Sequence, residues 1–537
     1  MKLYFIALLS LISFHFTSCA QSDKAIAISN GSSQLSVTRG AYLQQVTNES
    51  ITIRWRTNFP TDSKVTYGKT LNYGKQVVSI DSTSEHQIQL NGLSPSTLYF
   101  YTVGSSDEIV QGDSTNYFIT APAPGSFVPT RVWVTGDFGV GSQGQFDVRD
   151  AYKNYSNVPT NLWIWLGDNA YASGTDSEYQ SYVFDVYPEQ LKHFPLYPAP
   201  GNHDYGNVGY LSASALTNNF PYFSIFTVPT LGEAGGYPSG TPKYYSYNYS
   251  NVHFISLDSY GAYNTPGSAM YEWLVKDLSM NSQRWTIVYF HHPPYTKGTH
   301  NSDTEIELID MRTHIIPLLE TYNVDLVLNG HSHVNERSFL IKGHYGLSDT
   351  FDSTMIVQPA TNQFTKTVPY RGTIYGVCGT AGQYVGPPMS DAPMPCMYFN
   401  DYTTNCSMVL DIEGDLLSGK YLSATGEIKD EFSITKSGAG PAFNPNIPSC
   451  EISYNSGTGI IYLSMFLPET ANVQADLFNL LGENVARFNT VPKTLSNGYH
   501  VEAVSSQNVV NSNGIYLVKV QIGQQVFSKK LFIKNLN

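Results

Sequence analysis

Six short apolar runs in the middle of the chain each end in a polar side chain. The clearest run occupies residues 161–165 and leads into Leu-Gly-Asp-Asn-Ala-Tyr at residues 166–171. An apolar run of this length between polar residues is typical of a buried strand. The side chains that follow the six runs are Asp137, Asp168, Asn202 with His203, Asp258, His291, and His331 with His333. A single Gly-Asp pair is ordinary turn chemistry, so the argument depends on the whole set.

The spacing of these runs predicts an α/β architecture for residues 128–436. Helical stretches at 178–191, 270–279 and 304–322 lie between the strand-like runs, and this alternation favours a sheet covered by helices. Such sheets bind their ligands at the carboxyl ends of the strands. We therefore expect the polar strand ends to meet at one edge.

Two all-β units are predicted on either side of this α/β region. Residues 37–120 alternate apolar and polar positions between frequent turn residues, which is typical of a β-sandwich. Residues 445–537 again read as short strands, at 475–482, 513–520 and 526–533. The expected architecture is an N-terminal β-sandwich, a central α/β sandwich and a small C-terminal all-β sandwich.

The residue types at the strand ends are those of a metal centre. Imidazole, carboxylate, amide oxygen and phenolate suit iron, manganese and zinc. His331 and His333 follow a strand and are separated by one residue, so they can reach two neighbouring ions. Asp258 is interpreted as a helper or a turn residue, and His292 as structural.

The order of the motifs resembles that of the metallophosphoesterase superfamily, and Tyr171 narrows the resemblance to the purple acid phosphatases. The motifs are GDFG at 136–139, GDNAY at 167–171, GNHD at 201–204, VYFH at 288–291 and GHSH at 330–333. The resemblance covers about residues 37–435, because these enzymes often carry a fibronectin type III-like domain (here 37–120) ahead of a calcineurin-like metallophosphoesterase sandwich (here 128–436). It implies seven metal ligands: Asp137, Asp168, Tyr171, Asn202, His291, His331 and His333.

The resemblance also divides these ligands between two ions. Asp137, Tyr171 and His333 would bind one ion, Asn202, His291 and His331 the other, and Asp168 would bridge them. The first ion then has two full anions and the second only neutral ligands besides the bridge, which favours a trivalent ion beside a divalent one. A phenol with a pKa of ~10 binds as phenolate only to a strongly acidic ion. The expected cofactors are Fe(III) with Zn, Mn or Fe(II), and a visible phenolate-to-iron colour.

The activity implied by the resemblance is that of a secreted acid phosphatase acting on small-molecule phosphate monoesters through a metal-bound hydroxide. His203 and His300 are the candidate catalytic residues outside the ligand set. Asn301 stands where the family has a further histidine, so the leaving-group acid stays open. Two alternatives remain: a phosphodiesterase or nucleotide pyrophosphatase on the same metal core, and a catalytically dead surface adhesion protein.

The first twenty residues read as an export signal. Lys2 precedes an apolar stretch at 3–16, and small residues around Cys19 offer a cleavage site. The stretch is too short to span a membrane, so no transmembrane segment is expected after its removal; lipidation of Cys19 is the alternative. The cysteines left are Cys378, Cys396, Cys406 and Cys450. An even number in an exported chain favours disulfides, with Cys396–Cys406 as the first expectation.

The C-terminal unit resembles the sorting domain of type IX secretion cargo. The runs NGIYLVKV at 513–520 and KKL at 529–531 carry the resemblance. It implies the type IX secretion machinery as a partner and a secreted or cell-surface location outside a bacterial outer membrane. A carbohydrate-binding or stalk module is the alternative. The formal charge of −13 argues against nucleic-acid binding.

Overall fold

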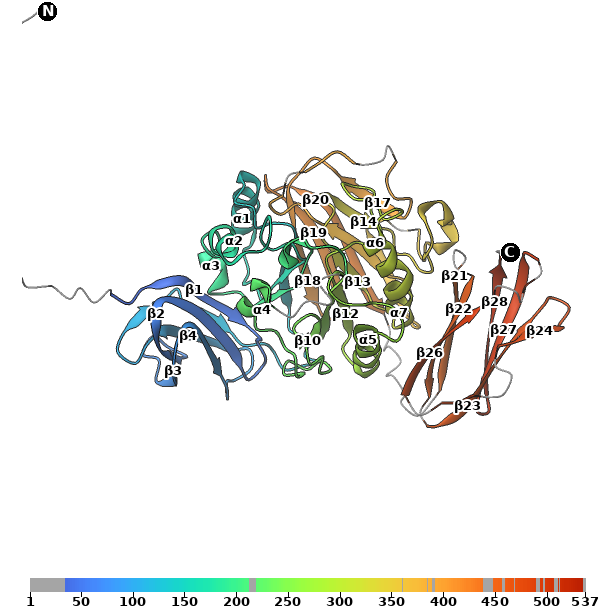
Figure 1. Cartoon of the computed structure of the whole chain (residues 1–537), viewed down its shortest axis with the longest axis horizontal. Coiled ribbons are helices and arrows are strands. Elements are labelled where there is room, and N and C mark those ends of the chain that lie inside the picture. Colours follow the sequence, from blue (N-terminus) through green and yellow to red (C-terminus); the bar gives the residue numbers. More distant parts are fainter. Residues whose placement is uncertain are drawn as a thin grey trace, which may run out of the picture. The chain divides into compact units, whose positions relative to one another are not determined.

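The computed structural model describes most of the chain beyond the expected export signal. The described residues are 34–211, 219–359, 361–383, 385–388, 392–437, 448–455, 459–467, 469–488, 493–495, 498–506, 510 and 512–534. The predicted signal at 1–20, with Cys19, lies outside them. Strands outnumber helices in all parts of the described chain (Figure 1).

The N-terminal part forms one six-stranded sheet. The strand order is β1-β2-β4-β5, with β3 paired to β2 and β6 paired to β4. Ile51, Ile53 and Trp55 of β2 join the hydrophobic core, and the polar residues between them, Thr52 and Arg54, are buried as well. The strands are β1 (Val37–Gln44), β2 (Ile51–Gly68), β3 (Lys75–Leu90), β4 (Leu98–Gly104), β5 (Ile109–Gln111) and β6 (Tyr117–Ile119).

The central part contains two seven-stranded sheets. The first sheet has the order β10-β11-β12-β13-β16-β14-β17, and the second has the order β15-β20-β19-β18-β7-β8-β9. Strands β11, β12, β13 and β16 run parallel, as do β7, β8 and β9. The first sheet comprises β10 (Tyr245–Tyr249), β11 (Val252–Ser256), β12 (Trp285–Tyr289), β13 (Leu326–Asn329), β14 (Asn335–Ser338), β16 (Ile374–Cys378) and β17 (Met397–Asp401). The second comprises β7 (Thr130–Thr135), β8 (Leu162–Trp165), β9 (Leu196–Pro198), β15 (Gln363–Thr367), β18 (Cys406–Glu413), β19 (Leu416–Ser423) and β20 (Ile428–Ser437).

Helices cover the faces that the two sheets turn away from their shared core. In β12, Ile287 and Tyr289 join the core common to both sheets, whereas Val288 packs with Leu274 of α5. Successive side chains of a strand point to opposite faces, so both faces of this sheet are buried. The helices are α1 (Gln143–Tyr155), α2 (Asp176–Tyr179), α3 (Pro188–Leu191), α4 (Pro221–Ile225), α5 (Ala269–Met280), α6 (Ile306–Asp310) and α7 (Ile316–Thr321). Within the residues described, none of these helices is long and apolar enough to cross a membrane.

The helix predictions were right for two of three segments. Residues 270–279 lie in α5, and 304–322 contain α6 and α7 joined by a π-helical turn, Met311–Ile315. The segment 178–191 is not one helix, because α2 passes into a π-helical turn and the chain breaks before Pro188 of α3. The residue before a proline is disfavoured in the helical conformation, and Tyr187 has φ −118° and ψ 38°.

The expected disulfide between Cys396 and Cys406 is wrong. Both thiols are free, as is that of Cys378. Cys396 packs among apolar side chains on the outer side of the first sheet, whereas Cys406 opens β18 of the second sheet. Between these two cysteines the chain passes from the first sheet to the second, so their closeness in sequence does not bring them together as a pair.

The C-terminal part is all-β, as expected. Its strands form a three-stranded sheet, β21-β22-β26, and a five-stranded sheet in which β24, β23, β27 and β28 are neighbours and β25 pairs with β23. The predicted strands at 513–520 and 526–533 correspond to β27 and β28, whereas only residues 475–478 of the predicted strand at 475–482 lie in β23 and the rest form a turn. The strands are β21 (Ser449–Asn455), β22 (Ile460–Leu467), β23 (Ala471–Phe478), β24 (Asn484–Arg487), β25 (Lys493–Leu495), β26 (Gly498–Ser505), β27 (Gly514–Ile522) and β28 (Gln525–Ile533).

A buried group of three charges ties the two central sheets together. Asp325, immediately before β13 of the first sheet, lies 2.7 Å from Nζ of Lys366 in β15 and 2.6 Å from Nζ of Lys436 in β20. Burial alone would raise the pKa of Asp325, but the two ammonium groups hold it below its ordinary value. This contribution to stability is therefore present above the unfolded pKa of Asp, about 3.9, and is lost as the pH falls through the lower folded pKa.

We predict that Asp325→Asn lowers the free energy of unfolding by about 3–5 kcal/mol, because it leaves two buried ammonium groups without a carboxylate. Urea unfolding followed by circular dichroism measures this. The control is Glu431→Gln, which removes an exposed carboxylate 3.5 Å from Lys420 and should cost less than about 1 kcal/mol. Equal losses in the two variants would show that the buried group does not hold the sheets together.

Candidate metal centre

The predicted ligand-bearing strand ends converge at the junction of the two central sheets. Asp137, Asp168 and Asn202 follow β7, β8 and β9 of the second sheet, while His291 and His331 follow β12 and β13 of the first. In both sheets these are the carboxyl ends of parallel strands, as the sequence predicted. The chain turns sharply there: φ is 56° at Asp137, 51° at Asp168 and 66° at His331.

Two buried carboxylates share one phenol at the centre of this junction. The hydroxyl of Tyr171 lies 2.9 Å from Oδ1 of Asp137 and 3.2 Å from Oδ2 of Asp168. Burial and the two adjacent carboxylates raise the pKa of Tyr171 well above its ordinary value. The phenol thus keeps its proton here, and only a strongly acidic cation would displace that proton.

The carboxylate of Asp168 also contacts a histidine from the opposite sheet. Nδ1–H of His291 donates to the carbonyl of Leu166 at 2.9 Å, which leaves Nε2 3.1 Å from Oδ2 of Asp168. Burial alone would lower the pKa of His291, but Asp168 and Asp137 raise it to about 9. A carbonyl at Nδ1 that fixes the orientation of Nε2 is a common arrangement for metal-ligating histidines.

Three further predicted ligands lie at the same junction. The backbone N–H of His331 donates to Oδ2 of Asp137 at 2.9 Å, and Nε2 of His333 lies 3.6 Å from Oδ1 of Asp137. Burial and the neighbouring imidazole of His300 lower the pKa of His331 to about 3, so its ring is neutral and able to bind a cation. Asn202 is 8% exposed, and among the described residues no group hydrogen-bonds its buried Oδ1.

The two predicted outer histidines border this group. His203 donates its backbone N–H to Oδ1 of Asp168 at 2.8 Å and Nδ1–H to the carbonyl of Ala172 at 2.6 Å. His300 donates Nδ1–H to Oε2 of Glu305 at 2.7 Å, and its ring centre lies 3.7 Å from that of His331. Both histidines are partly exposed, as substrate contact requires.

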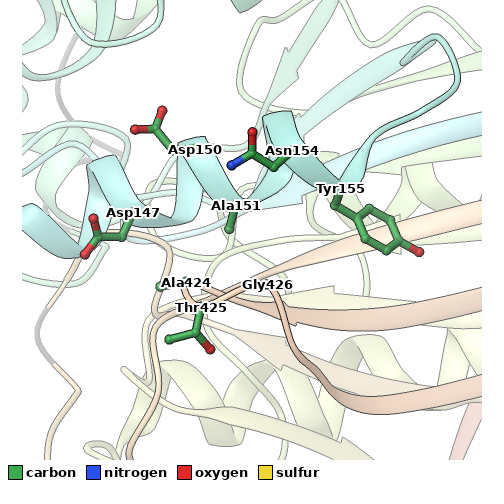
Figure 2. A pocket seen from close by; sticks show the side chains of 8 residues that line it. All are labelled: Asp147, Asp150, Ala151, Asn154, Tyr155, Ala424, Thr425 and Gly426. Atoms are coloured by element: carbon green, nitrogen blue, oxygen red, sulfur yellow. The ribbon is translucent and has the colours of Figure 1, made fainter.

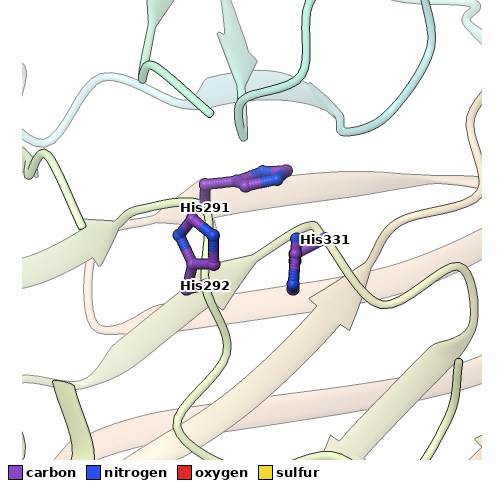
Figure 3. A group of neighbouring side chains, drawn as sticks. All are labelled: His291, His292 and His331. Carbon is purple, nitrogen blue, oxygen red and sulfur yellow. The ribbon is translucent and has the colours of Figure 1, made fainter. Parts of the chain in front are cut away.

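His292 and Asp258 lie beside the proposed ligands, and both are hydrogen-bonded to neighbouring residues. His292 is buried and pairs through Nδ1 with the hydroxyl of Ser259 at 2.8 Å, and its ring plane is at 88° to that of His291. Figure 3 shows the two rings leaving consecutive residues in different directions, with His331 beside them. Asp258 accepts hydrogen bonds from the backbone of Tyr260 and Gly261 and from Tyr205.

Asp204 is a supporting residue that the sequence reasoning missed. Its buried carboxylate accepts from the backbone N–H groups of Asn169 and Gly201 and from the hydroxyl of Tyr179. Burial and the charge of Asp168 raise its pKa to about 7. The signal was present, because an acid follows His203 directly in GNHD, but two of its partners, Asn169 and Tyr179, lie 35 and 25 residues earlier in the chain.

Glycine precedes four of the proposed ligands, and at each of these glycines the neighbouring atoms leave no room for a side chain. A Cβ atom at Gly201 would collide with Oδ1 and the backbone nitrogen of Asp168, and one at Gly330 would collide with Oδ2 of Asp137. The repeated Gly-ligand pairs of the sequence therefore record close packing of these loops, which at Gly201 and Gly330 is against the two carboxylates.

We predict that Gly201→Ala lowers the metal content of the purified protein and its melting temperature, because Asp168 must move. Elemental analysis and thermal unfolding measure the two effects. Gly514→Ala is the control, since the nearest side-chain atom to its Cβ is 3.5 Å away. A Gly201→Ala protein with the metal content of the parent would show that the position of Asp168 does not control metal binding.

The chemistry of the group fits a pair of cations. Among the described residues there are three groups of potential metal ligands in which the ligand atoms all lie within 4.8 Å of one another. One of these groups is Asp137, Asp168 and His291. Buried carboxylates need compensating positive charge, and the unpaired amide oxygen of Asn202 is a suitable ligand atom.

A second feature, a pocket of about 320 Å³ between α1 and the turn at 424–426, lies away from these residues and has no comparable set of ligands (Figure 2).

Comparison with known proteins agrees with this geometry. Residues 130–335 match the family described as calcineurin-like phosphoesterase, and residues 40–121 match the N-terminal domain of purple acid phosphatases. Purple acid phosphatase 15 of Arabidopsis thaliana is 30% identical over 297 residues, which are 50% of this chain and 51% of that protein. Probable purple acid phosphatase 20 of the same plant is 26% identical over 55% of this chain and 68% of its own length. The chain thus spans about half the length of the first of these relatives.

Solved structures show the same fold. A purple acid phosphatase, PPD1, from yellow lupin seeds superposes with a TM-score of 0.59 and 18% identity, covering 74% of this chain and 75% of that one. A structure of PhoD superposes with a TM-score of 0.54 and 14% identity, covering 74% of this chain and 90% of its own. The central sheets have the metallophosphoesterase fold, preceded by an all-β domain.

Proposed function

Since this chain combines a calcineurin-like phosphoesterase domain with the N-terminal domain of purple acid phosphatases, we propose that it is a metal-dependent acid phosphatase. Its substrates would be small phosphate monoesters. Its cofactors would be Fe(III) and a divalent ion, Zn, Mn or Fe(II). The sharing of the Tyr171 hydroxyl by Asp137 and Asp168 carries the proposal, because this arrangement calls for strong positive charge.

The proposed ligands would be divided as the charges suggest. Asp137, Tyr171 and His333 would hold the ferric ion, and Asn202, His291 and His331 the divalent ion, with Asp168 between them. The two metal ions would supply positive charge to the phosphate oxygens and lower the pKa of a water molecule. The closeness of Asp137 to Tyr171 and His333, and of Asp168 to His291, supports this division.

The residues outside the ligand set would orient the ester and supply a proton. His203 is anchored at Nδ1 by the carbonyl of Ala172, so Nε2 is its free ring nitrogen. His300 is anchored at Nδ1 by Glu305, which also leaves Nε2 free. A protonated imidazole can give its proton to the departing alcohol oxygen, and it is available at acidic pH. His300, whose ring is held in place by Glu305, is our choice for that donor.

We predict that the protein hydrolyses p-nitrophenyl phosphate faster than bis-p-nitrophenyl phosphate. Asp168→Asn should lower kcat by about 10²–10³-fold or more, because a central charge is lost. Asp147→Asn, in the pocket of Figure 2, is the control and should keep the parent activity. Preference for the diester would indicate a phosphodiesterase or pyrophosphatase. Absence of hydrolysis in the metal-loaded parent would indicate a non-catalytic surface protein.

We predict that the oxidised, iron-loaded protein absorbs visible light and that Tyr171→Phe abolishes this band, because the band needs a phenolate on ferric iron. A visible spectrum together with elemental analysis tests this. Tyr398→Phe, at a tyrosine that is 44% exposed, should leave the spectrum unchanged. A colourless, active protein with fewer than two metal ions per chain would contradict the assignment of iron.

We also propose that the protein works outside the cell. The apolar stretch after Lys2 supports export, and the NGIYLVKV and KKL runs support delivery through type IX secretion. Both runs lie on paired neighbouring strands, β27 and β28, of the C-terminal sheet. The N-terminal sheet would then act as the fibronectin type III-like support of the catalytic part.

A further inference from the structure

Glu305 lies between a proposed substrate-side histidine and a proposed metal ligand. Its Oε2 is 2.7 Å from Nδ1 of His300 and 3.7 Å from Nε2 of His331. Its Oε1 accepts the backbone N–H of Asn301 at 2.6 Å. The three side chains form a group whose ligand atoms lie within 4.8 Å of one another. We propose that Glu305 is a positioning residue that holds His300 toward the substrate and adds negative charge beside the divalent ion.

This inference rests on the proposed function and extends it to a residue outside the seven ligands. Glu305 precedes α6 directly and thus has a fixed backbone support. Both of its oxygens are engaged within the segment 300–305, so the carboxylate fixes that segment as well as the ring of His300. The residue just before this segment contacts the metal side, because the hydroxyl of Thr299 accepts the backbone N–H of His333 at 2.8 Å.

The position of Glu305 changes the charge balance of the divalent half of the centre. The ligands assigned there are neutral apart from the shared Asp168. Nε2 of His331 lies 3.7 Å from Oε2 of Glu305, so a cation bound at that nitrogen would have a full negative charge nearby. Outer partners of this kind typically account for 10–100-fold in metal affinity.

The same contact assigns a role to His300 where the family's next histidine is missing. With Asn301 unable to donate a proton, His300 is the histidine of this segment that can do so. Its ring lies against His331 with centres 3.7 Å apart and planes at 34°. The bond from Nδ1 to Glu305 prevents rotation of this ring, and the ring nitrogen left for substrate is Nε2.

The test compares Glu305→Gln and Glu305→Asp with the parent and with Glu307→Gln, which removes one carboxylate in the first turn of α6. Calorimetric titration of metal-stripped protein with Zn²⁺ gives the affinities. We expect Glu305→Gln to weaken the weaker Zn²⁺ site by about 10–100-fold and Glu305→Asp to keep most of the affinity, because it keeps the charge. Glu307→Gln should match the parent.

Steady-state kinetics on two monoesters separate positioning from folding. An alkyl phosphate such as glycerol 2-phosphate needs a proton on its leaving oxygen, whereas p-nitrophenolate leaves without one. Both Glu305 variants should lose about tenfold more kcat on the alkyl ester than on p-nitrophenyl phosphate, with KM little changed. A variant that is merely misfolded would lose both activities alike, and circular dichroism shows that state directly.

Each outcome decides between the two proposals. Glu305 variants with parental Zn²⁺ affinity and parental rates on both esters overturn the role of Glu305 and leave the phosphatase proposal intact. Equal losses on the two esters overturn the positioning role as well. A parent protein that binds no Zn²⁺ and hydrolyses neither ester overturns the proposed function together with this inference.

Discussion

The centre of this protein depends on two carboxylates, Asp137 and Asp168, that are buried close together around one phenol. Each lies at a strand end where burial makes an uncompensated negative charge cost several kcal/mol. His291 compensates part of the charge of Asp168, and its raised pKa of about 9 records that attraction. Two cations in the same place would compensate both carboxylates, displace the proton of Tyr171 and use the free oxygen of Asn202.

The scaffold holds these carboxylates through backbone N–H donors, whose positions are set by the loops that carry them. The backbone N–H group of His331 donates to Asp137, and that of His203 donates to Asp168. The loops that carry these two histidines are therefore held by the two carboxylates. The glycines before the ligands allow this approach. The buried Asp325 group, at the opposite end of β13 from His331, keeps the two sheets in register from the other side.

The strand ends and the polar residues that follow them could be predicted from sequence because each depends on a few adjacent residues. The apolar runs before Asp137 and Asp168 form β7 and β8, and the polar side chains meet as expected. Contacts between distant segments could not be predicted in this way. Asp204 accepts a hydrogen bond from the backbone of Asn169, 35 residues earlier. The role proposed for Glu305 depends on its closeness to His331. The Cys396–Cys406 expectation failed for the same reason, since neighbours in sequence lie on different sheets.

The N-terminal sheet contributes to the site through the loop that follows Tyr171. Arg39 and Arg56 each contact a different oxygen of Asp176, at 2.8 and 2.6 Å, where α2 begins. Within the same turn, Glu178 accepts the backbone N–H groups of Ala172, at 2.7 Å, and of residue 173. The segment next to the phenol is therefore fixed by α2, and α2 is fixed by arginines of the preceding domain. Because the carbonyl of Ala172 also anchors His203, this support reaches the substrate side of the proposed centre.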